Sequence, residues 1–527
     1  MRKKAIGIKE NISFINPGDF ELLGLTLFGK ENADGKRIQI ELPLIYSNFS
    51  VYEDINSPYL SGEVTIVDSS HLLSKLPIIG EETIQIFWRS MNTDISNFIR
   101  FRVVRLVNVE RLGEVTNVYT LELLSSISIH NQKTKVSKSF AKGSLSDMVA
   151  WVLENKLKMV NEETVDYVRQ GNDLVKNKDI EKNYFAVESK TPNVEKYVAA
   201  YMSPIRMVNK LSQRSNSSQG SLFYFFEDIS RFRFVNLLES ISEQKKNLNQ
   251  VKKLVYIPQN TSASAVLDNR LKWTIISDYK IKKRFDLFDN MAKGMYSSVA
   301  MYFDLEKRTL DVNSYYYQDD AKNSNHINND GHLLTTETSD VLHNSEYESA
   351  STISFLVPVC SGDKESQTYN DQRKHMFQQR ISSEAQLMNA LVMEISIAGD
   401  TTGSYSIGKL IHIHIPQDQS LEGNRNLTGY YFITKIRHDI DKGNNRYNIT
   451  MEVVSDTMFS GNRSELQAED YVDTDGIAVN AKEQPIGKNQ EIVHTSILSS
   501  EKVDNYNILT RERTLVHKLL KRVKNNV

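Results

Sequence analysis

The residues of this chain whose types and spacing could do chemistry lie between Gly403 and His414. Gly403 to Lys409 reads GSYSIGK and matches the G-x-x-x-x-G-K pattern of a phosphate-binding loop. The Ser or Thr that would hold magnesium is replaced by Leu410, and the residues that follow, LIHIHIP, alternate like a strand. A phosphate site of this kind needs a helix N-terminus at that point. We therefore expect no nucleotide and no other cofactor.

Two histidines in the same segment have a spacing that could begin a metal site. His412 and His414 are two residues apart, so on a strand both side chains point to one face. The nearby sequence offers no third ligand, and we expect a polar face that lines solvent or an interface, with no metal. The chain has neither a G-x-S-x-G elbow nor an H-E-x-x-H helix, and we assign no catalytic residue. A triad or carboxylate pair that assembles only in space stays open.

Composition limits the function further. The 527 residues include 64 basic and 66 acidic side chains, a net charge of -2 that disfavours a dedicated nucleic-acid binder. The strongest basic cluster, Lys280, Lys282, Lys283 and Arg284, fits the outer face of a strand better than a contact with DNA or a membrane. The lone Cys360 forms no disulfide within the chain. We expect neither a secretory signal nor a membrane-spanning helix.

The elements that must position these residues are mainly strands, and two stretches of them form a near-repeat. TLELLSS begins at Thr120 and TMEVVSD at Thr450, and each follows an Ile-Gly pair and a strand-like run. The repeat signature consists of Gly80, Thr120, Glu122, Gly408, Thr450 and Glu452. The glycine-to-threonine spacings, 40 and 42 residues, agree closely. We interpret this as one β-domain used twice, although strand patterns can also agree by chance.

The sequence predicts a mainly β fold with inserted α+β segments. Apolar stripes predict helices after Ser144 and Ser203, and residues 371–398 are predicted to form a helix that leads into the second β-domain. The expected domains are a first β-barrel at 1–135, an inserted α+β domain at 136–250, a strand-rich connecting domain with an exposed loop at 251–350, a second β-barrel at 351–458 and a C-terminal extension at 459–527. A candidate docking helix near the end has the apolar face Leu515, Val516, Leu519, Leu520 and Val523.

Several segments, taken in order, resemble a known family. VYEDINSPYLSGEVTIVDSSHLL with PIIGEETIQIFW is similar to the opening barrel of the baseplate central hub protein of contractile-tailed, T-even-type phages. LFYFFEDISRFRF resembles its inserted domain, and GMYSSVAMYFDLEKRTL resembles a later hairpin. IGKLIHIHIPQ, LTGYYFITKIRHDI and YNITMEVVSDTM resemble its second barrel. Related domains form the N-terminal part of type VI secretion spike proteins. The resemblance covers most of 40–458.

The resemblance implies a structural protein of the virion, located in the tail baseplate and assembled in the host cytoplasm. Two tail-tube-like barrels per chain would alternate in a homotrimer, giving a pseudo-sixfold ring with a trimeric spike protein on one side and the hexameric tail tube or its initiator proteins on the other. Baseplate wedge proteins would be further partners, and DNA would only pass through the lumen. The alternatives are a hub of a non-phage contractile injection system, a tail-associated cell-wall hydrolase, and a DNA-binding protein.

Overall fold

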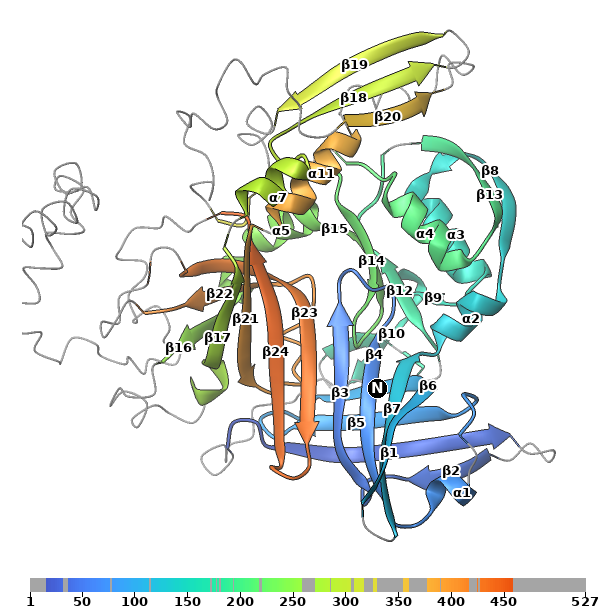
Figure 1. Ribbon diagram of the computed structural model, residues 1–527, viewed down its shortest axis with the longest axis vertical. Coiled ribbons are helices and arrows are strands. Elements are labelled where there is room, and N and C mark those ends of the chain that lie inside the picture. The colour runs from blue at the N-terminus through green and yellow to red at the C-terminus, as the bar shows by residue number, and fades with distance from the viewer. Residues whose placement is uncertain are drawn as a thin grey trace, which may run out of the picture. The chain divides into compact units, whose positions relative to one another are not determined.

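The computed structural model describes residues 16–457 except for internal gaps, of which the longest are 258–270, 317–325, 329–353 and 360–376. The candidate docking helix at 515–523 and the extension at 459–527 therefore lie outside the described residues, as does Cys360. The described part is mainly β with small helices (Figure 1), as the sequence predicts. None of its helices combines the length and hydrophobicity that crossing a bilayer requires.

The N-terminal strands form an antiparallel run in the order β2-β1-β5-β6-β7-β4-β3. Alternate residues of each strand point into one core, and on β6 these are Ile99, Phe101 and Val103. The elements of this run are β1 (Phe20–Glu31), β2 (Arg37–Glu41), β3 (Tyr46–Asp54), β4 (Ser61–Asp68), the short helix α1 (Leu72–Lys75), β5 (Thr83–Ser90), β6 (Ser96–Leu112) and β7 (Thr116–Ser125).

The C-terminal strands close on themselves. They follow the order β23-β22-β16-β17-β21-β24, and β24 pairs again with β23, which completes a six-stranded ring. The strands are β16 (Lys252–Tyr256), β17 (Ile275–Lys283), β21 (Leu391–Ala398), β22 (Leu410–His414), β23 (Gly429–Asp441) and β24 (Arg446–Ser455). The ring thus takes β16 and β17 from upstream of 351–458, the range in which the sequence places the whole second barrel. Among the described strands of the N-terminal run, no pairing joins β1 or β2 to β3.

The helix predicted over 371–398 is wrong in its second half. Helix α11 (Phe377–Leu387) ends early, and residues 391–398 form strand β21 between β17 and β24. Met393, Ile395 and Ile397 are buried at alternate positions, which is the period of a strand. The uninterrupted apolar start of the segment, Leu-Val-Met, hides that period in the sequence.

The residues between β7 and β16 form helices and short strands around a second core. Helices α3 and α4 pack their apolar faces into it, and α4 begins at the expected proline, Pro204. Strands β14, β15, β12 and β9 form one sheet, while β13 pairs with β8 and β10 pairs with β11. The elements are α2 (Ile127–Lys133), β8 (Val136–Ser144), α3 (Leu145–Asn155), β9 (Val160–Asn161), β10 (Tyr167–Gln170), β11 (Asp173–Lys176), β12 (Tyr184–Val187), β13 (Val194–Met202), α4 (Pro204–Ser212), β14 (Phe223–Glu227), β15 (Phe232–Asn236) and α5 (Leu237–Lys245).

A further three-stranded sheet comes from the connecting region. Strand β18 (Ser297–Asp304) pairs with β19 (Thr309–Tyr316) and with β20 (Ser354–Val359), and helix α7 (Leu287–Ala292) precedes them. Most of the predicted exposed loop lies outside the described residues. Its described part, 326–328, is not exposed, since Ile327 and Asn328 are buried and the Asn328 amide donates to the carbonyl oxygen of Tyr430.

One pairing joins the N-terminal run to the C-terminal ring. Strand β3 pairs antiparallel with β23 from Asp54↔Lys435 to Asn48↔Asp441, so all these strands belong to one thirteen-stranded sheet (Figure 1). The backbone N–H of Ile55 donates to the Thr434 carbonyl at 3.0 Å and continues the pairing beyond the strand end. Paired in this way, the edge of the run that β3 would otherwise expose is covered within the chain.

Candidate functional site

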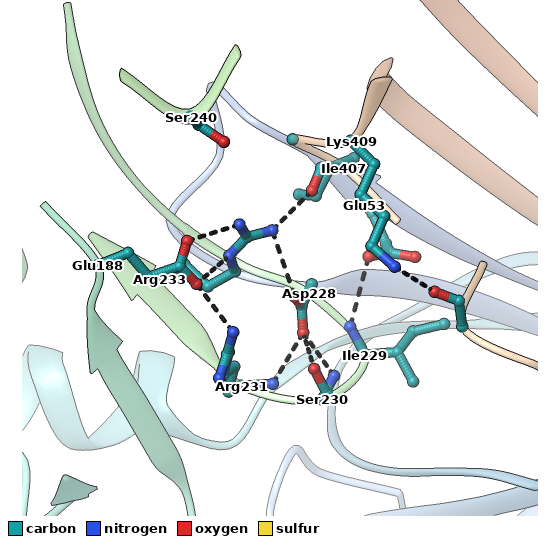
Figure 2. Close-up of polar contacts among 12 residues, drawn as sticks. Glu53, Glu188, Asp228, Ile229, Ser230, Arg231, Arg233, Ser240, Ile407 and Lys409 are labelled. Carbon is teal, nitrogen blue, oxygen red and sulfur yellow. Dashed lines mark hydrogen bonds and ion pairs between the residues drawn. The ribbon is translucent and has the colours of Figure 1, made fainter. Parts of the chain in front are cut away.

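The candidate site is a buried polar junction where the β14–β15 hairpin meets both sets of strands (Figure 2). The hairpin turn is built by Asp228, whose carboxylate accepts hydrogen bonds from the backbone N–H groups of Ser230 at 2.7 Å and Arg231 at 2.9 Å. Aspartate favours such turns because its short side chain can bond the backbone two or three residues on. The turn places Arg231 and Arg233 at the start of β15, where both guanidinium groups meet Glu188.

Arg233 is the centre of the junction. Its Nε and Nη2 donate to the two carboxylate oxygens of Glu188 at 2.8 and 2.7 Å, and its Nη1 donates to the Ile407 carbonyl at 2.9 Å. The residue is only 8% exposed. Burial opposes the charge, but the carboxylates of Glu188, Asp228 and Glu53 together outweigh it and raise the pKa of Arg233. A bidentate ion pair of this kind fixes the relative orientation of the two side chains as well as the distance between them. The insertion is therefore held against the turn that precedes β22.

That turn depends on Gly408. Its φ of +83° lies in the left-handed region, and a Cβ there would meet Arg233 Nη1 at 3.1 Å. On α5, the Gln244 side chain donates to the Gly408 carbonyl at 2.9 Å and accepts from the Leu410 N–H at 2.8 Å. The phosphate-loop-like segment thus serves a different purpose. Its Lys409 ammonium donates to the Gly403 carbonyl at 2.7 Å, and strand β22 follows it where a phosphate site would have a helix.

A buried hydrogen-bonded chain connects the junction to the β3–β23 pairing. Glu53 of β3 bonds His438 Nε2 of β23 at 2.9 Å, and His438 Nδ1 bonds the Tyr447 hydroxyl of β24 at 2.7 Å. Burial keeps the pKa of Tyr447 well above its usual value, so the hydroxyl remains a donor. With Tyr447 donating to Nδ1 and Nε2 donating to Glu53, all three groups are paired. Glu53 also accepts from the N–H of Ile229 at 3.4 Å, at the tip of the hairpin (Figure 2).

Glu227, the last residue of β14, ties the hairpin to the N-terminal strands. Its carboxyl oxygens accept from the N–H of Leu60 and the hydroxyl of Ser125, both at 3.0 Å. Part of the side chain remains accessible, yet burial of the carboxyl group, with a smaller contribution from Asp228 and Glu53, raises the pKa of Glu227 to about 8. The hairpin therefore holds the run and the ring together. Because Glu53, His438 and Tyr447 are at most 2% exposed, they can fix strands but cannot meet a substrate from solvent.

The residues of the repeat signature occupy matching positions in the two sets of strands. Thr120 of β7 faces Thr65 of β4, and their hydroxyl oxygens are 3.3 Å apart. Thr450 of β24 faces Ser396 of β21, and the corresponding distance is 3.4 Å. Gly80 has a φ of +96°, and like Gly408 it precedes a strand of its set.

The glutamates of the signature also match. Glu122 pairs in register with Arg105, and the charged groups are 3.3 Å apart. Glu452 pairs in register with Lys435 at 3.1 Å. Just before each basic residue the register shifts by one, at Val104 in β6 and at Thr434 in β23. Such bulges are specific local features of a strand pair. Because one occurs beside the same basic–glutamate pair in both sets of strands, the two sets match in detail as well as in strand order.

The predicted basic cluster forms ion pairs on β17. Lys282 lies 2.5 Å from Glu394 and 3.3 Å from Glu452, and Lys283 lies 3.6 Å from Asp289. Burial alone would raise the pKa of Glu452, but Lys435 and Lys282 reverse this and lower it. Lys282 thus reaches the signature glutamate from the neighbouring part of the sheet.

His412 and His414 lie on one strand as predicted, but the expectation that they form a polar face lining solvent or an interface is wrong. They are 7% and 2% exposed, and all five residues of β22 are buried, so both faces of the strand are covered within the chain. The His412 ring packs edge-on against Tyr430 with centroids 4.8 Å apart. Burial, with Lys253 and His414 as lesser causes, lowers the pKa of His412 to about 3, so the ring is neutral at pH 7. Within the described residues, no cluster of three or more candidate ligands could hold a metal ion.

The residues of the junction are not predictable from the sequence pattern. They come from three separate parts of the chain: Glu53 from β3, Glu188 from the end of β12, and Glu227 and Arg233 from the β14–β15 hairpin. One signal was available. All five residues of β15 are buried, and its sequence FRFVN places an arginine between two phenylalanines. A charge in a strand of this kind requires a buried partner.

Comparisons with known proteins give a likeness of fold. No family model matches the chain, and no curated protein matches it. The tail protein from Neisseria meningitidis MC58 is 8% identical over 83% of this chain and 97% of its own, with a TM-score of 0.43. The 43 kDa tail protein of prophage MuSo2 from Shewanella oneidensis is 9% identical over 82% of this chain and 99% of its own, with a TM-score of 0.42. A type VI secretion component from E. coli is 8% identical over 84% and 79% of the two chains, with a TM-score of 0.36. At these values the similarity concerns the general fold and not the residues of a site.

Removing the guanidinium group of the junction should destabilise the protein strongly. Arg233→Met leaves Glu188 and Asp228 without their buried partner, and we expect a loss of about 3 kcal/mol in the free energy of unfolding, measured by urea denaturation. The control Lys246→Met breaks the exposed pair with Glu243 and should cost at most about 0.5 kcal/mol. The double variant Arg233→Met/Glu188→Leu should recover part of the loss. If Arg233→Met and Lys246→Met lowered the free energy of unfolding equally, Arg233 would not be the centre of the junction.

Gly408→Ala should destabilise the turn before β22. A residue with a Cβ pays about 1–2 kcal/mol in the left-handed region, and this Cβ would also displace the Arg233 guanidinium. We expect a total loss of about 2–3 kcal/mol. Gly24→Ala on β1 is the matched control, since its Cβ would make only an ordinary contact with Phe87 at 3.9 Å. An unchanged melting temperature for Gly408→Ala would show that the turn before β22 does not require glycine at this position.

The raised pKa of Glu227 predicts a stability that falls as pH rises. Between its ordinary value of 4.5 and about 8, the folded protein keeps a proton that the unfolded chain has released. The free energy of unfolding therefore decreases from about pH 4.5 to pH 8. Glu227→Gln removes the charge and should be more stable than the unchanged protein at pH 8 by about 1–3 kcal/mol, with little difference at pH 4.5. Glu243→Gln, on the exposed face of α5, should leave the pH profile of the melting temperature unaltered.

Proposed function

We propose that this chain is a structural hub of a phage tail baseplate, which forms a trimeric, pseudo-sixfold ring, joins the central spike to the tail tube and lets DNA pass. The observation that carries the proposal is a five-strand unit that occurs twice. One copy is β5-β6-β7-β4-β3 and the other is β22-β23-β24-β21-β17, with every neighbouring pair antiparallel. Two like units per chain give six in a trimer, which removes the mismatch between a threefold and a sixfold partner.

The agreement of cross-strand details supports a true duplication over a chance likeness of strands. Hydroxyl pairs, basic–glutamate pairs and bulges recur at the same places in both units. Chance similarity of strand patterns would reproduce the alternation of apolar residues but not the bulge beside the ion pair. We therefore infer two barrel-like domains, a first one within 1–135 and a second one within 351–458 that is completed by strands from 251–350. Residues 136–250 form the insertion between them, and 459–527 the C-terminal extension.

The junction suits a structural role better than a catalytic one. A ring of six similar units stays regular only if the two units of each chain keep a fixed angle. The β3–β23 pairing, with its Glu53–His438 bond, and the contact of Arg233 with Ile407 supply that constraint. The proposed partners are a trimeric spike protein, tail-tube or tube-initiator proteins, and wedge proteins, without stable insertion in a membrane. The near-neutral charge suits a lumen through which DNA moves, because strong phosphate binding would hinder its passage.

The mass of the purified protein tests the ring. Light scattering over a concentration series should give a species of three times the 60.4 kDa of one chain, and electron-microscope class averages of it should have six lobes. A stable dimer would contradict the threefold model. If only monomer is found, the proposal requires that co-expression with the spike protein of the same genome produces a trimeric complex, and failure to form one would count against it.

A further inference from the structure

A basic cleft lies between the outer face of the N-terminal strands and the insertion. Its volume is about 740 Å³, and its cationic side chains come from β2, β6, α2 and the segment after α3. We define the basic cleft by Arg37, Arg100, Arg102, His130, Lys133 and Lys158. Among the described residues that line it, none is acidic. Because the chain as a whole is nearly neutral, this cleft concentrates positive charge in one place, which attracts anions.

The strand register explains why the cations gather. Arg100 and Arg102 alternate with the buried residues of β6, so both project to the outer face. Across that face, Thr83 and Gln85 of β5 stand directly opposite them and add a hydroxyl and an amide to the floor of the cleft. Phe28 of β1 continues the floor toward β2.

The cleft holds its positive charges close together. Burial and the neighbouring Arg37 lower the pKa of Arg102, and Arg100 adds to this. Glu81 and Glu82 act in the opposite sense without reversing the shift, and the Arg102 Nη1 donates to the Glu81 backbone carbonyl at 2.6 Å. Positive groups gathered in this way are stabilised when an anion enters between them. The cleft is thus complementary to a ligand with carboxylate or phosphate groups.

The remaining lining indicates which anionic ligand fits. Ile127, Ile129 and Leu157 add apolar surface, and Gln39 and Asn183 add amide groups that match a peptide backbone. Phe28 is the one aromatic residue among the described lining residues, whereas nucleic-acid sites stack several bases on aromatic rings. The cleft is a bounded pocket of about 740 Å³, in the size range of sites that enclose a ligand segment, whereas a DNA duplex is read by elements that project into its grooves. We propose that the basic cleft binds an acidic, partly apolar peptide segment of a partner protein.

The proposal can be tested with a fluorescein-labelled ten-residue peptide of alternating Glu and Leu, by fluorescence anisotropy with the full chain. We expect saturable binding that weakens as salt is raised. Arg100→Gln/Arg102→Gln should weaken it at least tenfold, since two charge-assisted hydrogen bonds are lost. The double variant Lys133→Gln/Lys158→Gln changes only exposed side chains, so we expect it to fold like the unchanged protein. It should weaken peptide binding several-fold. The matched control Lys142→Gln, an exposed lysine of β8 outside the cleft, should bind like the unchanged protein.

Three results would overturn the proposal. The first is equal affinity for a peptide with Lys in place of Glu, which would remove the role of charge. The second is unchanged affinity in both cleft variants, which would place the binding elsewhere. The third is tighter binding of a single-stranded oligodeoxynucleotide of twenty nucleotides that is lost in the cleft variants, which would assign the cleft to nucleic acid. The oligomeric state of the protein enters none of these readouts, so their failure is separate from a failure of the ring.

Discussion

The pairing of β3 with β23 is the interaction on which the rest of the described structure depends. Strand β3 has β4 on one side, and β23 has β24 on one side and β22 on the other only at Gly429–Phe432. Without their mutual pairing, β3 and residues 435–441 of β23 would each expose an edge. By pairing with each other they satisfy these backbone groups and convert two sets of strands into one sheet. Side chains strengthen the same contact. Ser50 of β3 donates to Asp439 of β23 at 2.6 Å, and Glu53 of β3 bonds His438 Nε2 of β23 at 2.9 Å.

A sheet pairing alone leaves freedom to twist, and the buried polar junction removes it. The β14–β15 hairpin contacts the N-terminal strands through Glu227 and the turn before β22 through Arg233. Buried ion pairs contribute little net stability, because desolvation offsets much of the attraction. Their directional geometry nevertheless penalises every other arrangement, since any shift leaves a charge unpaired. Such a junction is suited to a protein whose task is to keep two units at one angle.

Features that depend on residues close together in the chain could be predicted from the sequence, and features that depend on residues far apart in the chain could not. The mainly β fold, the start of α4 and the matching positions of Thr120 and Thr450 depend on neighbours along the chain or on one strand partner, and patterns of period two reveal them. The strand at 391–398 cannot be told from a helix in the sequence, because its first residues are all apolar. The junction was not foreseen, because Glu53 and His438 are separated by 385 residues and only the closed fold brings them together. The burial of His412 was missed for the same reason, since a strand sequence does not reveal whether both of its faces are covered.

The two five-strand units differ most in the strand that pairs with their first member, β5 or β22. Beside β5 lies β1, which is antiparallel to it, whereas beside β22 lies β16, which is parallel. β16 also pairs with β17 and closes the ring, a position that β1 does not take among the described pairings. In the proposed trimer, surfaces made by the shared strands would repeat six times, and surfaces that involve β1 or β16 would repeat three times. A single chain would then offer sixfold contacts on one kind of surface and threefold contacts on another, and a protein between a hexameric tube and a trimeric spike has to provide both.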